Sequence, residues 1–175
     1  ERLMASPHAV VGVVTQPDRP SGRGQRTHDT PVKAAAAPHR IPVFQPATLK
    51  DPSIEPALRG LAPDLGVVAA YGRILPSRLL TLPRLGMINV HASLLPRYRG
   101  AAPVHRAVIN GDRETGVTIM RVVPELDAGA MFATVTRQID PDDTSDVVER
   151  DLATLGAELL VSVVNQMAAG TATET

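Results

Sequence analysis

Gly66-Val67-Val68-Ala69-Ala70-Tyr71 is the stretch of sequence that decides the fold. It is a short, almost continuous apolar run, which is typical of a strand buried on both faces of a sheet. The segment from Pro76 to Leu82 predicts a short helix, and Gly86 to His91 forms a second apolar strand pattern. Because a helix separates two buried strands, we expect the strands to lie parallel in one sheet.

The same alternation continues on both sides of this unit. Further strands are predicted at Val10 to Thr15, Ile41 to Phe44, Gly116 to Val122 and Ala130 to Ile139. Further helices are predicted from Thr30-Pro31 to Pro38, at Pro52 to Leu61, at Pro103 to Asn110, and onward from Thr144, while Gln16 to Thr30 is expected to be a loop. The sequence therefore predicts an α/β domain with a mostly parallel sheet.

The composition restricts the function. The 175 residues are enough for one domain with a substantial core. The 18 basic and 18 acidic residues cancel, so contact with RNA requires a local basic patch. The sequence contains no cysteine, which excludes disulfides and thiolate metal sites and is compatible with the cytoplasm. No membrane segment of ~20 apolar residues is predicted, and because the histidines show no ligand spacing we expect no metal.

Polar residues gather at the end of the strand from Gly86 to His91. Asn89 and His91 are two residues apart, so both side chains point to one face, at the carboxyl end where open α/β sheets bind ligands. Asp127 lies in a loop that can return to the same edge. An amide, an imidazole and a carboxylate suit acyl transfer to an amine, because they stabilise an oxyanion and transfer protons. Spacing alone leaves turn capping and a structural histidine open as alternatives.

The segment Asn89-Val90-His91-Ala92-Ser93-Leu94-Leu95-Pro96 resembles the signature of the 10-formyltetrahydrofolate-dependent formyltransferase family. The likeness continues through Arg97 to Pro103, Gly116 to Met120 and Leu126 to Gly129. It implies a Rossmann-like catalytic domain with helices on both faces of the sheet and 10-formyltetrahydrofolate as formyl donor. By this resemblance Asn89, His91 and Asp127 are catalytic. The residues that correspond to folate contacts are Gly72, Arg73, Ile74, Leu75, Ser93, Leu94, Leu95, Pro96, Val123, Pro124, Glu125 and Leu126.

A basic loop points to one branch of this family. The segment from Thr15 to Gln25 resembles a loop of the branch that formylates the α-amino group of initiator methionyl-tRNA, and Pro31 to Lys33 and Val43 to Pro46 extend the match. From Gln16 to Lys33 four bases and two acids give 4 − 2 = +2, which suits a phosphate backbone. The expected tRNA contacts are Arg19, Arg23, Arg26, Lys33, Arg97 and Arg99.

Three alternatives to this substrate stay open. The acceptor can be a sugar or nucleotide amine, the protein can be a non-catalytic folate- or RNA-binding relative, and the basic loop can be a solvated surface loop.

The ends of the sequence lead to an expectation about domains. A doubly wound domain normally begins with a strand, whereas Glu1 to Ser6 resembles the tail of a helix. The last residues are small and polar, like the start of a linker. We therefore expect residues 1–168 to form a formyltransferase catalytic domain without its first strand. Residues 169–175 are expected to begin a linker to a C-terminal domain.

Overall fold

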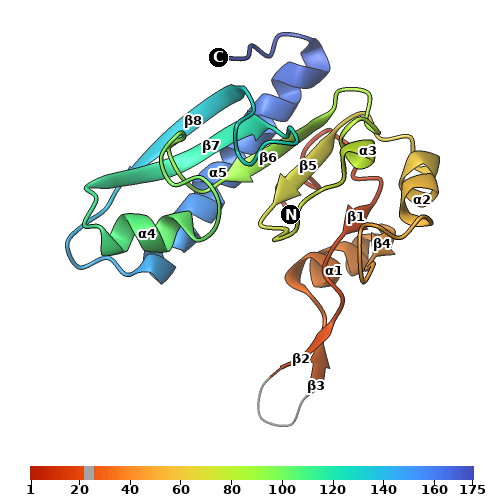
Figure 1. The fold of residues 1–175 in the computed structure, drawn as a ribbon, viewed down its shortest axis with the longest axis horizontal. Helices are drawn as coiled ribbons and strands as arrows, with labels where there is room; N and C mark the ends of the chain where they lie inside the picture. The colour runs from red at the N-terminus through yellow and green to blue at the C-terminus, as the bar shows by residue number, and fades with distance from the viewer. Residues whose placement is uncertain (22–25) are drawn as a thin grey trace.

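The computed structural model describes residues 1–21 and 26–175, and the side chains of residues 1–18 and 28–175. Its largest sheet has four strands in chain order (Figure 1). These strands are β5 (Gly66–Ala69), β6 (Met87–His91), β7 (Glu114–Arg121) and β8 (Met131–Gln138). The alternation of strands and helices and the Rossmann-like class are confirmed, as are the predicted parallel strands β5 and β6.

The prediction of a mostly parallel sheet is wrong for the second half of the chain. β6 pairs with β7, and β7 with β8, in antiparallel register. His91 lies opposite Thr118 and Ile88 opposite Arg121, so β7 starts at the edge where β6 ends. The connection, which contains helix α4 (Pro103–Ile109), therefore stays at that end of the strands and does not cross back over the sheet. Returning to the same edge reverses the strand direction.

The N-terminal part forms two smaller sheets. β1 (Val13–Val14) pairs in parallel with β4 (Val43–Phe44). β2 (Arg19–Ser21) and β3 (Arg26–His28) form an antiparallel hairpin that extends from the domain (Figure 1). The expectation of a loop over residues 16–30 is therefore wrong at these strands. Three-residue strands are too short for their side-chain alternation to be recognised in a sequence.

The long helix α5 (Ser145–Ala169) packs on one face of the four-stranded sheet, over β7 and β8. Thr144 caps its first turn by accepting a hydrogen bond from the Val147 N–H, as predicted, and Gly170 ends it in a left-handed conformation. Gly156 allows close packing, because a Cβ there would lie 3.2 Å from Val117. By length and composition α5 is apolar enough to cross a membrane. In the fold, its apolar side chains pack against the sheet. This core contains Val148, Leu152, Leu160, Val163 and Val164 of the helix and Ile88, Val117 and Ile119 of the strands.

Short helices cover the other face of β5 and β6. They are α2 (Ile54–Gly60) and α3 (Ser77–Leu80), and their residues pack with Met87, which points away from the α5 side of β6. Helices on both faces are therefore confirmed. Helix α1 (Pro31–Ala36) begins at the predicted Thr30 cap, and a 3₁₀ turn, Ala37–His39, follows it.

The last residues pack back onto the sheet. Glu174 forms an ion pair with Arg121, and the backbone of Thr175 exchanges two hydrogen bonds with Met131. The expected linker from residue 169 stays a prediction, since α5 itself continues to Ala169.

Candidate active site

His91 and Asp127 come together as expected from the sequence. His91 ends β6 and is only 6% exposed, and its Nδ1 lies 3.7 Å from Asp127 Oδ2. The other ring nitrogen, Nε2, lies 3.0 Å from the Tyr98 carbonyl oxygen. A carbonyl oxygen only accepts, so Nε2 carries a proton and donates it to this hydrogen bond. In neutral His91 the Nδ1 lone pair therefore faces the carboxylate, and a proton taken up at Nδ1 meets a negative charge.

Backbone features fix the position of Asp127. It adopts a left-handed conformation with φ of 46°, which aspartate tolerates better than most residues. The Gly100 N–H donates a 2.7 Å hydrogen bond to Asp127 Oδ2. Two residues later, Gly129 passes so near β7 that an added Cβ would lie 2.0 Å from the Arg121 carbonyl oxygen. The path of this loop therefore favours aspartate at position 127 and requires glycine at position 129.

Asn89 lies two residues before His91 on the same strand, about 6.6 Å along it, with its side chain on the same face. The residue is partly exposed. Its side-chain amide makes no hydrogen bond within the part of the chain that the structure describes, so the N–H groups are available to a ligand.

The three predicted folate loops differ in exposure. Gly72, Arg73 and Ile74 follow β5 at its carboxyl end, and Ile74 is 87% exposed. Leu126, in the loop that carries Asp127, is 67% exposed. Its neighbours Pro124 and Glu125 are also exposed, whereas Val123 is partly buried. Ile74 and Leu126 are large apolar side chains in contact with solvent. Covering them with a flat ring system would be favourable, because it removes apolar surface from water.

The remaining predicted folate residues have structural contacts. Ser93 is fully buried, and its hydroxyl donates to the Arg97 carbonyl oxygen at 2.6 Å. The Leu95 N–H donates to Thr118 Oγ1 at 3.2 Å. Leu94 packs against Gly116, where an added Cβ would lie 2.5 Å from it. The Leu95–Pro96 peptide bond is cis. Leu75 packs in the core beside α3.

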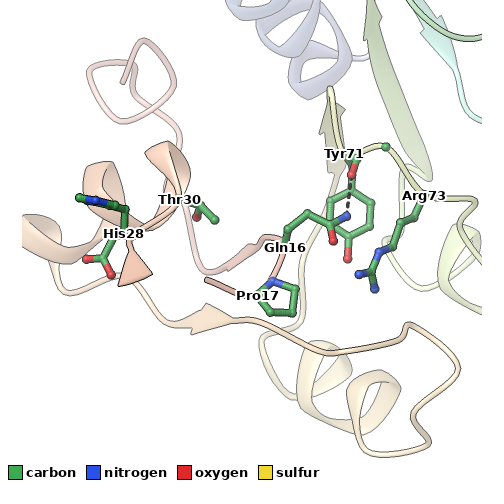
Figure 2. Close-up of a pocket in the computed structure, with 8 residues that line it drawn as sticks. Gln16, Pro17, His28, Thr30, Tyr71 and Arg73 are labelled. Carbon is green, nitrogen blue, oxygen red and sulfur yellow. Dashed lines mark hydrogen bonds between the residues drawn. The ribbon is translucent and has the colours of Figure 1, made fainter. Parts of the chain in front are cut away.

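A pocket of about 540 Å³ lies where the carboxyl ends of β1 and β5 meet (Figure 2). Gln16 Nε2 donates to the Tyr71 carbonyl oxygen at 2.9 Å, and Arg73 lines the same pocket. Gln16 Oε1 and the Tyr71 hydroxyl are buried and have no partner among the described residues. Burial raises the pKa of Tyr71. The sequence reasoning missed both residues, although a polar residue at the carboxyl end of a strand was the available signal.

Two predicted tRNA contacts are engaged within the domain. Lys33 forms ion pairs with Asp18 and, at 2.7 Å, with Asp29; its bond with Asp18 raises the pKa of Lys33 and lowers that of the carboxyl. Arg97 pairs with Asp112 at 2.9 Å, and the charge of Asp112 raises the pKa of Arg97. A phosphate that contacts Lys33 or Arg97 would therefore compete with these carboxylates, and the expected tRNA contacts of both residues stay predictions.

The other expected tRNA contacts remain candidates. Arg99 is exposed and has no ion pair with the described residues. Arg19 and Arg26 lie opposite His28 and Ser21 in the β2–β3 hairpin. Arg23 lies outside the described residues.

Comparisons with known proteins identify the family of this chain. A family model described as formyl transferase matches residues 2–164. The methionyl-tRNA formyltransferase of Methylococcus capsulatus is 54% identical over 167 residues, which are 95% of this chain and 54% of that protein. The chain spans about half the length of the curated relatives it matches.

Two solved structures show the same fold. A phosphoribosylglycinamide formyltransferase from Streptococcus pneumoniae has a TM-score of 0.78 at 23% identity, covering 95% of this chain and 91% of that one. A formyltetrahydrofolate deformylase from Pseudomonas syringae has a TM-score of 0.65 at 27% identity, covering 73% and 45%. Because the family model matches nearly the whole chain, this protein belongs to the formyl transferase family.

Proposed function

We propose that this chain is the catalytic domain of a cytoplasmic enzyme that formylates initiator methionyl-tRNA for translation initiation, with 10-formyltetrahydrofolate as donor. The observation that supports the proposal best is the 3.7 Å distance between His91 Nδ1 and Asp127 Oδ2, with Asn89 on the same face of β6 as His91. These three residues provide a base, a carboxylate that stabilises its protonated form, and a free amide.

The proposed chemistry follows from these positions. The α-amine of the methionyl group attacks the formyl carbon, a C–N bond forms, and negative charge develops on the formyl oxygen. Asn89 donates a hydrogen bond to that oxygen. His91 accepts the amine proton at Nδ1, and Asp127 stabilises the imidazolium. The bond to the donor nitrogen then breaks, and the proton passes to that nitrogen.

The described residues suit a folate donor. Exposed Ile74 and Leu126 offer apolar surface to a flat ring, and the backbone of residues 72–75 and 93–96 supplies polar groups. Formyltetrahydrofolate appears in the name of the deformylase from Pseudomonas syringae, whose fold this chain shares. A variant test for binding is Leu126→Asp, which should weaken equilibrium binding of a folate analogue by making that surface charged.

The choice of tRNA as acceptor rests on the name of the relative that is 54% identical and on the basic hairpin. A matched pair of variants tests the hairpin. Arg23→Ala in the full-length protein should raise the apparent KM for tRNA, and the effect should shrink as salt rises, because phosphate contacts compete with counterions. Arg84→Ala removes an exposed arginine that pairs with Asp64 away from the hairpin and should leave the KM unchanged.

The deciding experiment is a formyl-transfer assay of the full-length protein with three acceptors: charged initiator tRNA, amino sugars and amino nucleotides. Transfer to tRNA at a far higher kcat/KM supports the proposal. Preferred transfer to a small amine would favour the first alternative, and folate binding without transfer to any amine would favour a non-catalytic relative.

A further inference from the structure

We propose that Tyr98 and Asp112 are positioning residues that hold His91 and Asp127 in their working arrangement. The inference rests on the proposed function, since it concerns the same site. Residues 98–100 contribute one backbone group to each member of the pair. The Tyr98 carbonyl accepts from His91 Nε2 at 3.0 Å, and the Gly100 N–H donates to Asp127 Oδ2 at 2.7 Å.

The Tyr98 contact also selects the chemistry of His91. It requires the proton of neutral His91 to be on Nε2, which leaves Nδ1 as the basic nitrogen and points it at Asp127. If this carbonyl moved away, the proton could move to Nδ1 and hydrogen-bond to a nearby acceptor. His91 would then have no lone pair on the side that faces Asp127.

The backbone of Tyr98 is held in an unfavourable conformation. Its φ is 57°, in the left-handed region that bulky side chains adopt rarely. Such a conformation persists only where surrounding contacts impose it, and these residues cluster at functional sites. The contacts that impose it must therefore come from the side chain of Tyr98 or from its neighbours.

Those contacts converge on Asp112, in the turn between α4 and β7. The Tyr98 hydroxyl donates to Asp112 Oδ2 at 2.7 Å, and the Asn110 side-chain amide donates to the hydroxyl at 3.0 Å. Arg97 donates to both carboxylate oxygens of Asp112, at 3.0 and 2.9 Å. The Asp112 N–H in turn donates to the Ala107 carbonyl in α4. The Asp112 side chain is only 12% exposed, so its bond with the Tyr98 hydroxyl is partly shielded from water, whereas the Arg97 side chain is 58% exposed.

The contacts form a chain from a helix to the reacting groups. Helix α4 fixes Asp112, Asp112 fixes the Tyr98 ring, and the backbone at residues 98–100 fixes His91 and Asp127. Among the described residues, neither the Tyr98 hydroxyl nor Asp112 forms a hydrogen bond or ion pair with the side chains of His91 and Asp127. Their effect on the reaction therefore passes through backbone position alone.

The test uses the full-length protein with Tyr98→Phe, Asp112→Ala and Asp112→Asn. Tyr98→Phe removes only the hydroxyl, and Asp112→Asn keeps an oxygen that can accept from it. We expect Tyr98→Phe and Asp112→Ala to lower kcat by ~10- to 10²-fold, because a small misplacement of catalytic groups has effects of this size. The KM values for donor and acceptor should change little, and Asp112→Asn should recover most of the turnover.

A spectroscopic readout separates positioning from general destabilisation. The ¹⁵N chemical shifts of His91 should show the Nε2-protonated form in the wild type and a mixture of both forms in Tyr98→Phe. Asp143→Asn is the matched control, because Asp143 is as little exposed as Asp112 and also pairs with an arginine, Arg137, just before α5. It should lower the melting temperature without changing the His91 spectrum.

Two outcomes would overturn the inference: turnover within about twofold of wild type in Tyr98→Phe, or an unchanged His91 spectrum in that variant. A wild-type protein that formylates no amine would instead refute the proposed function. The His91 spectra of the variants would still decide whether Tyr98 and Asp112 fix its protonated nitrogen.

Discussion

Replacement of Asp127 by asparagine isolates the charge at the candidate active site. Asparagine tolerates the left-handed φ of 46° and keeps an oxygen that can accept from the Gly100 N–H. The loop path and the neighbouring hydrogen bond should therefore survive. The main change is the loss of the negative charge 3.7 Å from His91 Nδ1.

The structure gives the size of the effect. At 3.7 Å, unit charges in an effective dielectric constant of about 20 attract each other by roughly 4.5 kcal/mol. At ~1.4 kcal/mol per tenfold change, full loss of this attraction in the transition state would lower the rate by ~10³-fold. Both side chains keep some contact with solvent, 7% for His91 and 13% for Asp127, so we expect a fall in kcat of ~10²- to 10³-fold.

Single-turnover formyl transfer with saturating donor and acceptor measures this fall without interference from product release. Asp127→Ala is the comparison, because it also loses the hydrogen bond from Gly100 and the tolerance for a left-handed backbone. It should be at least as slow as Asp127→Asn and less stable to heat. A rate for Asp127→Asn within about threefold of wild type would refute the reasoning, since His91 would then not become charged beside Asp127.

Three further predictions follow from other parts of the structure. Asn89→Ala should lower kcat by ~10²- to 10³-fold with unchanged folate affinity in equilibrium binding, and a loss confined to affinity would make Asn89 a binding residue. Gly129→Ala should lower both the melting temperature and kcat, because its Cβ would lie 2.0 Å from the Arg121 carbonyl oxygen. The bond from Arg137 lowers the pKa of Asp143, so its stabilising effect is present above the unfolded pKa of ~4 and is lost as pH falls through the lower folded value. Acid unfolding of Asp143→Asn should therefore show a weaker dependence on pH than that of the wild type, and an identical dependence would contradict this.

Local patterns were enough to predict most of the elements, whereas the residues of the candidate site were assigned by the family resemblance. The capping pattern at Thr144 and the apolar runs of β5 and β6 depend on neighbours in sequence, so they could be recognised directly. The strand direction of β7 could not, because a helix of seven residues permits either a crossover or a return to the same edge. That choice depends on packing between α4 and the sheet.

Charge counting gives the net charge of a segment but not the ion pairs within it. Lys33 contributed to the predicted basic loop, but it is paired with Asp18 and Asp29 in the folded chain. The pair with Asp29 has the i,i+4 spacing of helical ion pairs and could have been recognised in the sequence. The role of Tyr98 could not, because it acts through its carbonyl oxygen, a group that every residue carries.

Backbone hydrogen bonds show where an additional strand would pair. No hydrogen bond joins the β1–β4 pair to the β5–β8 sheet among the described residues. The Gly66 N–H donates to Gly86, on the β6 side, so by alternation the N–H groups of Val67 and Ala69 point to the opposite edge. The Val13 N–H donates toward β4, which likewise directs the Val14 N–H to the free side of β1.

These two free edges lie near each other, because Gln16, just after β1, donates to the Tyr71 carbonyl, just after β5. Both edges are apolar, and the buried Gln16 Oε1 and Tyr71 hydroxyl lie without partners at their carboxyl ends. Val67 and Ala69 are exposed in this structure, and an exposed apolar strand with unpaired N–H groups is a site for pairing with another strand. We therefore predict that in the full-length protein one strand pairs with both edges. Amide hydrogen exchange measures this directly. The N–H groups of Val14, Val67 and Ala69 should exchange as slowly as those of β6 in the full-length protein, and faster in the 175-residue chain alone. Rapid exchange at these three positions in the full-length protein would show that the edges stay open.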